Sequence, residues 1–317
     1  MKKTIITSMA LVSLSAGVFL YSCKKEVAIQ PQNPTNALNS ALNGNREIQP
    51  GNEFNVSVTN NRLVFATIAD YQRVVDEPTE ATIQSFLYCI NQLSFTSLQE
   101  QYPTQSDTAS TKIYDDYFRA ILNPDRVVQI GTYIFRINAT QEKVFMLPSA
   151  YTGQYASLLA EDISNTNIKL YSTAEDVLDI IQNPDVTLRC KESGIGSYGP
   201  ATTFWIDNEK TLKVDGTVRF RRYGVYFHLF AEVKGTSGVK VSIDLEPVYY
   251  HVRCKNTVGP YKVNAYGGTT NYHKYSSYQG SKSLNKVYFR GKFTGKVTVN
   301  GTIYTKYSDW IQIRVNY

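Results

Sequence analysis

The chain has 317 residues with a formal net charge of +6, and 13% of its residues are aromatic, among them 24 tyrosines. This aromatic content argues against intrinsic disorder and indicates a folded chain. The length allows two domains.

The N-terminal 22 residues have the three parts of an export signal. Lys2 and Lys3 precede an apolar stretch from Ile5 to Leu20, and the small residue Ser22 stands at the end of the segment. The stretch is interrupted by serine and threonine and is shorter than the roughly 18 to 20 strongly apolar residues of a spanning helix. We therefore predict that residues 1–22 are a cleaved signal peptide.

The segment Leu20-Tyr21-Ser22-Cys23 resembles the lipobox of bacterial lipoproteins. Tyr21 departs from the commonest pattern, in which a small residue stands at that position. The resemblance implies that Cys23 is acylated and that the protein is attached to a membrane by this lipid anchor. Each buried methylene contributes about 0.8 kcal/mol, so several acyl chains suffice for stable attachment. An ordinary cleaved signal with an incidental cysteine is the alternative.

Residues 23–53 are predicted to form a flexible tether. They hold three prolines and many asparagines and lack the apolar residues that a core needs. A flexible chain of this length has a root-mean-square reach of roughly 30 Å. Lys24 is not the aspartate that retains some lipoproteins in the inner membrane, which favours the outer membrane or the cell surface.

Charge divides the remainder of the chain into two parts. Residues 54–199 hold 10 basic and 17 acidic residues, whereas residues 200–317 hold 18 basic and 7 acidic ones. We predict an acidic α+β domain at 54–199 and a basic antiparallel β-domain at 200–317. The basic half could meet an anionic partner, or the two halves could attract each other.

Hydrophobic spacing predicts the elements of the first domain. A short strand at 63–65 precedes a helix ending at Val75, and Thr79 caps a second helix. A third helix spans 113–121. The glycine-led pair Gly131-Thr132 predicts a hairpin between strands 127–130 and 133–137, with a further strand at 144–147. Ser172 to Glu175 has the pattern of a capping box before a last helix.

These packing and turn residues carry a second resemblance. The succession Leu63-Val-Phe65, Leu93 to Leu98 and Ile121-Leu-Asn123, followed by Val128 to Phe135, is similar to uncharacterised lipoproteins of Bacteroidota that share a domain of unknown function. Arg126 stands where that pattern would have glycine. The resemblance implies a shared architecture and envelope localisation, and it implies no activity.

Alternating apolar residues dominate the chain from Thr211 onward. Successive strands are predicted at 212–220, 225–233 and 239–245, with a bulge or edge after Pro247 and two long closing strands at 287–299 and 303–315. The predicted fold class is therefore α+β, in which a helical or α+β domain precedes an antiparallel β-sandwich.

No catalytic, metal or cofactor site is predicted from the motifs. Gly194 to Gly199 matches GxGxxG by letter but lacks the required strand before it and helix after it. The histidines His228, His251 and His273 have no metal-ligand spacing. Asp115 and Asp116 are interpreted as solvated helix carboxylates. A glycosidase is the enzymatic alternative, because its two carboxylates need not be close in sequence.

Three cysteines remain besides Cys23. Cys89 lies in the apolar pattern of the second helix and is predicted to be a core residue. Because exported proteins can form disulfides, Cys190 and Cys254 are the predicted pair.

Two features suggest ligand binding. One strand would display Lys286, Arg290, Lys292 and Lys296 on one face, which suits an anionic polymer such as an acidic polysaccharide or lipopolysaccharide. A predicted loop at 261–283 resembles antibody paratopes in composition, with Tyr266, Tyr272, Tyr275 and Tyr278 among small polar residues. A solvated sheet face, and tyrosines folded back onto the sheet, are the respective structural alternatives.

The sequence as a whole predicts a non-enzymatic cell-envelope lipoprotein that binds a glycan or a protein partner through its basic β-domain. No nucleic acid partner is expected. The alternatives are a structural or assembly component of the cell surface, and a hydrolase acting on a glycan.

Overall fold

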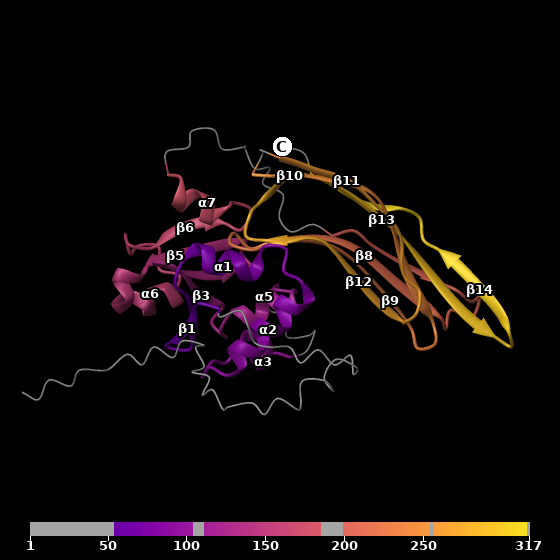
Figure 1. The fold of residues 1–317 in the computed structure, drawn as a ribbon, viewed down its shortest axis with the longest axis horizontal. Coiled ribbons are helices and arrows are strands. Elements are labelled where there is room, and N and C mark those ends of the chain that lie inside the picture. Colours follow the sequence, from indigo (N-terminus) through magenta and orange to yellow (C-terminus); the bar gives the residue numbers. More distant parts are fainter. Residues whose placement is uncertain (1–53, 104–110, 185–198, 254–255, 316–317) are drawn as a thin grey trace, which may run out of the picture.

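The computed structural model describes residues 54–103, 111–184, 199–253 and 256–315, and within these ranges the chain has an α+β fold (Figure 1). A mixed part with most of the helices is followed by a long arm of two antiparallel sheets. The predicted signal peptide, Cys23, the tether, Cys190 and Cys254 lie outside the described residues. Among the described helices, none combines the length and the apolar character needed to cross a membrane.

The first part is organised around a six-stranded sheet. Its spatial order follows the chain, and only the pair β2–β3 is parallel. Gly131, with φ of +57°, turns the predicted hairpin between β3 and β4. The strands are β1 (Val56–Thr59), β2 (Arg62–Phe65), β3 (Val127–Ile130), β4 (Tyr133–Asn138), β5 (Lys143–Pro148) and β6 (Lys169–Ser172).

Short capped helices pack against this sheet and bury a large aromatic core. Thr79 caps α2, as predicted, and Thr67 forms a capping box with Asp70 at the start of α1. Phe65, Tyr71 and Phe86 are almost fully buried in this core. The helices are α1 (Ile68–Val75), α2 (Glu80–Asn91), α3 (Leu98–Gln101), α5 (Asp116–Ile121), the 3-10 helix η1 (Ser149–Gln154), α6 (Tyr155–Leu159) and α7 (Val177–Gln182).

Three local predictions need correction or explanation. The third predicted helix begins at Asp116, later than expected, because Asp115 caps it. Asp176, rather than Ser172, caps α7. Arg126 has a φ of +64°, a left-handed conformation that favours glycine, which is the residue expected at this turn.

The second part is a β-sandwich-like pair of sheets around its own core. Gly216 faces Phe293 across this core so closely that an added Cβ would lie 2.3 Å from the ring. One sheet has the order β12-β9-β8-β7, with β7 (Ala201–Trp205), β8 (Lys213–Arg222), β9 (Phe227–Gly235) and β12 (Tyr272–Gly280). The other has the order β11-β10-β13-β14, with β10 (Lys240–Val252), β11 (Asn256–Gly267), β13 (Leu284–Val299), β14 (Thr302–Tyr307) and β15 (Ile311–Val315), which also pairs with β13.

The sheets correct two sequence predictions and confirm a third. The region 261–283 is not a loop, because most of it belongs to β11 and β12. The last predicted strand is two strands, β14 and β15. Between them the Ser308 hydroxyl accepts the Phe293 amide hydrogen, and the Ser308 amide donates to the Phe293 carbonyl. The bulge predicted near Pro247 is present as register shifts in β10.

The two parts meet at the end of the β8–β9 hairpin. Tyr223, Val225 and Tyr226 extend from this hairpin into the core of the first part, where both tyrosine rings stack on Phe118. Cys89 is buried in the same core, as predicted, and is disulfide-bonded to a partner outside the described residues. The first core therefore extends past residue 200 and includes residues of the second half.

Candidate functional site

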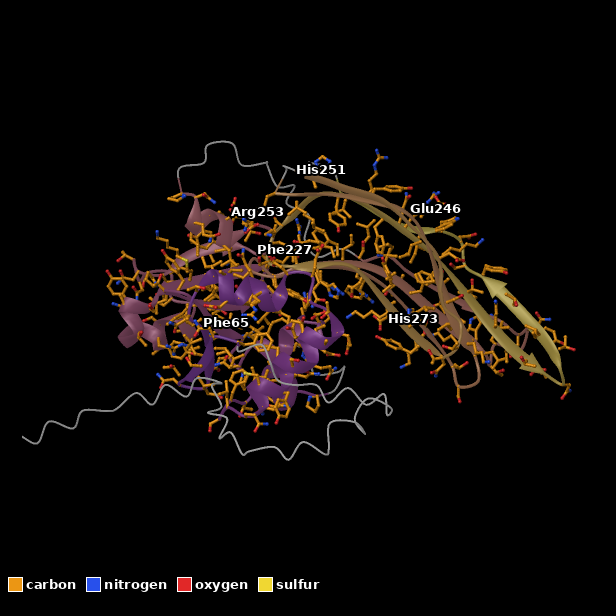
Figure 2. All side chains as sticks on the ribbon, viewed as in Figure 1. Phe65, Phe227, Glu246, His251, Arg253 and His273 are labelled. Atoms are coloured by element: carbon orange, nitrogen blue, oxygen red, sulfur yellow. The ribbon has the colours of Figure 1, made fainter. Side chains whose placement is uncertain are left out.

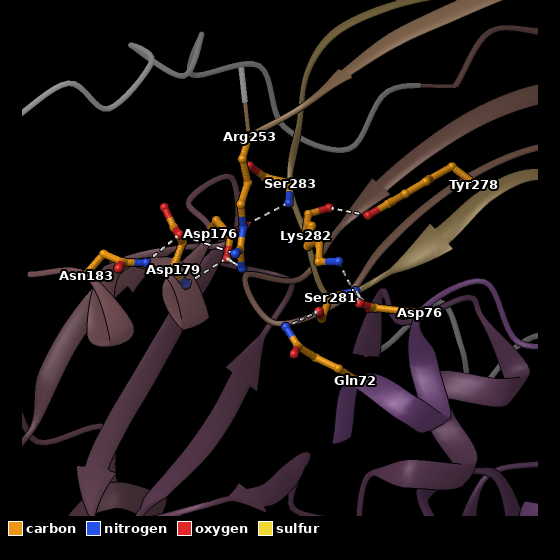
Figure 3. Close-up of polar contacts among 10 residues, drawn as sticks. All are labelled: Gln72, Asp76, Asp176, Asp179, Asn183, Arg253, Tyr278, Ser281, Lys282 and Ser283. Carbon is orange, nitrogen blue, oxygen red and sulfur yellow. Dashed lines mark hydrogen bonds and ion pairs between the residues drawn. The ribbon is translucent and has the colours of Figure 1, made fainter. Parts of the chain in front are cut away.

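Opposite charges connect the two parts at one edge of their interface (Figure 3). The Arg253 guanidinium donates to Asp176, with Nε 2.7 Å from Oδ2, and lies 3.3 Å from a carboxylate oxygen of Asp179. Asp176 also accepts the Ser283 amide hydrogen at 2.9 Å. Acidic residues of the first part thus pair with a basic residue of the second.

The same pattern recurs beside this cluster. Asp76, directly after α1, accepts the Ser281 amide at 2.7 Å and lies 3.3 Å from the Lys282 ammonium. Gln72 donates to the Ser281 hydroxyl at 3.3 Å. The charge difference between the halves of the sequence therefore serves, in part, their mutual docking.

A third interface cluster brings together a carboxylate, an imidazole and a hydroxyl, and its first two members are buried. It comprises Asp115 at the start of α5, His228 on β9 and Ser276 on β12. His228 Nδ1 lies 2.6 Å from Asp115 Oδ2, and Nε2 lies 2.9 Å from the Ser276 hydroxyl oxygen. The histidine is 1% exposed and the aspartate 3%, whereas Ser276 is exposed. A buried carboxylate and imidazole therefore lead to a hydroxyl at the surface.

Hydrogen bonds hold the Asp115 carboxylate in place. Oδ1 accepts the Phe118 amide at 2.9 Å as the helix cap and the Tyr226 hydroxyl at 3.0 Å. Lys274 Nζ lies 3.5 Å from Oδ2. Burial disfavours the charge, but His228, Lys274 and the helix amide together outweigh this cost and hold the pKa of Asp115 well below its usual value.

Burial lowers the pKa of His228 despite the neighbouring carboxylate. A neutral imidazole has one N–H, and placing it on Nδ1 avoids lone-pair repulsion with Asp115. The Nδ1 contact is short but poorly aligned for a hydrogen bond. In this tautomer Nε2 has a free lone pair and accepts the Ser276 hydroxyl hydrogen.

Cations gather next to this cluster. The Arg221 side chain, directly opposite His228 in the β8–β9 register, lies 4.3 Å from the ring of Tyr114. Arg221 and Lys112 line a pocket of about 230 Å³ together with Glu142 and Thr173. The interface thus has a positively charged side close to the histidine.

Sequence reasoning did not find this site. Asp115 was interpreted as solvated, and His228 as an ordinary polar strand residue; both are buried against each other. The available signal was the isolated histidine among buried alternating residues of β9, together with an aspartate at the predicted start of a helix. Nothing in the sequence spacing could pair residues 113 positions apart.

The predicted basic face lies on the outer side of the other sheet. Phe289, Gly291 and Phe293 point into the sandwich, so Arg290, Lys292 and Lys296 alternate outward along β13. Lys240 of β10 is directly opposite Lys296 in the register, and both are exposed. Three of the four predicted basic residues therefore share one face, joined by Lys240.

Aromatic rings and two carboxylates complete this face, which we call the β13 face. The Lys292 ammonium lies 5.0 Å from the centre of the Tyr307 ring, and the Arg290 guanidinium lies 5.0 Å from that of Trp310. Arg290 pairs with Glu246, which Figure 2 shows on the side of the arm away from the helices. Asp244 is opposite Lys292 in the register.

The predicted tyrosines do not form one exposed loop. Tyr278 is buried in the sandwich core and Tyr275 packs against that core, whereas Tyr272 is 47% exposed. They lie on the sheet opposite the β13 face. The side chains of Tyr266 and Lys286 lie outside what the structure describes, although both residues pair within strands.

Among the described residues, no cluster of three or more histidine, cysteine, aspartate or glutamate side chains is placed to hold a metal ion. Comparison of the chain with models of protein families, with curated proteins and with solved structures found no match.

Proposed function

We propose that this protein is a lipid-anchored component of the bacterial cell envelope that binds an acidic glycan on its β13 face. The observation that carries the proposal is the row formed by Arg290, Lys292 and Lys296 beside exposed aromatic rings. Ammonium and guanidinium groups attract the acid groups of such a polymer, and rings provide flat apolar contact area for sugars.

The position of the β13 face supports this proposal over a role in docking the two parts. The acidic residues that contact basic residues across the interface, Asp76, Asp115, Asp176 and Asp179, lie against β12 and the ends of β10 and β13. None of these contacts involves Lys240, Lys292 or Lys296. These three lysines of the β13 face are thus available to a partner, whereas Arg290 is paired with Glu246. The predicted lipid anchor would hold the protein near envelope polymers.

The test compares the full mature chain with a triple variant, Arg290→Gln, Lys292→Gln and Lys296→Gln. Binding would be measured by calorimetry with polygalacturonate and chondroitin sulfate as acidic probes and dextran as the neutral probe, each at 50 and 300 mM salt. We expect binding to the acidic probes only, weakened by salt because exposed charges are screened, and reduced at least tenfold in the variant.

A matched control replaces three exposed lysines elsewhere, Lys169, Lys210 and Lys234, with glutamine. It has the same net charge as the triple variant. Equal weakening by both variants would show that net charge, rather than the β13 face, attracts the polymer. Unchanged binding in the triple variant would overturn the proposal.

A further inference from the structure

The geometry points to a second activity: we propose that Ser276 is a nucleophile, with His228 as its general base and Asp115 as the residue that orients the base, and that the site hydrolyses an acyl ester. The proposal is independent of glycan binding, because it concerns the opposite sheet. It rests on three side chains brought together from α5, β9 and β12.

The distances are those required for proton transfer. A general base must lie within about 2.6–3.2 Å of the hydroxyl that it deprotonates, and His228 Nε2 is 2.9 Å from the Ser276 oxygen. The 2.6 Å contact of Nδ1 with Asp115 lies in the same range, and such contacts often align only when substrate binds. Nucleophile, general base and orienting carboxylate are therefore joined by consecutive contacts, as such a site requires.

Burial differs along the cluster in the way that a nucleophile needs. Asp115 and His228 are shielded from water, and Phe230 stacks on the imidazole with ring centroids 4.5 Å apart. Ser276 is exposed, so a substrate can reach its hydroxyl. A hydrogen bond between His228 and Ser276 with a purely structural role would not require Ser276 to be exposed to solvent.

Positive charge lies on the same face of the strand. Lys274 is two residues before Ser276, so both side chains project from the same side of β12, and its ammonium lies over the Phe230 ring at 4.7 Å. An ammonium group in this position can stabilise the negative oxygen that develops during acyl transfer. We assign an ester rather than an amide as substrate, because an ester carbonyl is more electrophilic than an amide carbonyl and an alkoxide leaves more easily than an amide anion.

The reaction balances with water as the only co-reactant. The Ser276 oxygen attacks the ester carbonyl carbon while its proton moves to His228 Nε2. The carbon–oxygen bond to the alcohol then breaks, and Nε2 returns the proton to the departing alkoxide. Water attacks the acyl-serine, giving its proton to Nε2, and Ser276 leaves with that proton as the carboxylic acid is released.

The test uses a fluorophosphonate probe and p-nitrophenyl acetate with the full mature chain. We expect the probe to phosphonylate Ser276, as located by peptide mass spectrometry, and a measurable turnover of the ester. Ser276→Ala should abolish both without changing the melting temperature, because this side chain is small and exposed. Asp115→Asn should reduce the turnover at least a hundredfold by disfavouring the required tautomer.

The matched control is Ser277→Ala, one residue further along β12, because it is the Ser276 hydroxyl that contacts His228. Labelling and turnover should survive this change. Labelling that is absent from the wild-type protein, or that persists in Ser276→Ala, would overturn the proposal and leave the cluster as a structural connection. Loss of glycan binding in the β13-face variant would have no bearing on this result.

Discussion

The two outer faces of the sandwich are built from the same residue types and behave differently. On the sheet β12-β9-β8-β7, Arg221, His228 and Lys274 are covered by the segment that begins α5. Arg221 and the neutral His228 are buried, and Lys274 is paired with Asp115. On the β13 face, Lys296 is exposed and Arg290 and Lys292 are partly exposed, with Arg290 paired to Glu246 of the same sheet. The same alternation of polar residues along a strand therefore gives an interface on one sheet and a free surface on the other.

This difference shows that the contribution of a charged side chain to folding stability depends on how deeply it is buried. A buried carboxylate that loses its partners, or a buried cation that loses its carboxylate, has no water to replace them, whereas an exposed one does. Replacing charges at the docked face should therefore change folding stability, and replacing charges at the β13 face should change binding.

The largest expected effect is that of Asp115→Ala. It removes the cap of α5 and leaves the His228 imidazole, the Lys274 ammonium and the Tyr226 hydroxyl without their shared acceptor. We expect a loss of about 3–5 kcal/mol in the free energy of unfolding, measured by urea titration. Asp125→Ala is the control, because that residue is exposed, and it should cost less than about 1 kcal/mol. Equal losses would contradict the comparison.

A smaller effect is expected from Arg253→Met at the edge of the interface. The change leaves the buried Asp176 carboxylate with backbone donors only, from Ser283 and Asp179. Loss of charged hydrogen bonds of this kind should lower the free energy of unfolding by about 2 kcal/mol. A double-mutant cycle with Asp176→Asn measures the coupling, and a coupling near zero would show that the pair does not hold the two parts together.

The pH dependence provides a test without a charge deletion. Because the pKa of His228 in the folded protein lies below the usual 6.5, the unfolded chain binds more protons once the pH falls below about 6.5. The free energy of unfolding should therefore decrease as the pH falls from 7 toward 5. The variant His228→Gln should show a flatter dependence in this window, with His251 and His273 common to both proteins. Identical slopes would be inconsistent with a buried neutral histidine.

The smallest effect on stability is expected at the β13 face. Lys292→Gln combined with Lys296→Gln should change the free energy of unfolding by no more than about 0.5 kcal/mol, because both ammonium groups keep their hydration. Urea titration at two salt concentrations measures this. A loss comparable to that of Asp115→Ala would mean that the face is a structural element rather than a surface for a partner.

Local elements of the fold were predictable where a short stretch of chain carries its own signal. Thr79 caps α2, Gly131 turns the β3–β4 hairpin, and the bulge follows the shift in apolar phase near Pro247. The prediction of a loop for the tyrosine-rich region 261–283 was wrong, because it relied on the small polar residues of that region. Instead β11 pairs with the preceding strand β10, β12 pairs with the more distant β9, and Tyr278 is buried in a core that also contains residues of β8 and β9.

The sequence by itself determined the fold class, the alternation that places Arg290, Lys292 and Lys296 on one face, and the opposite charges of the two halves. Each depends on period or composition, which are local or additive properties. Only the tertiary structure decided that Asp115, His228 and Ser276 meet, and that one sheet face is covered while the other is open. Such pairings depend on how separate elements pack, and burial then sets the charge state and the reactivity of the groups that meet.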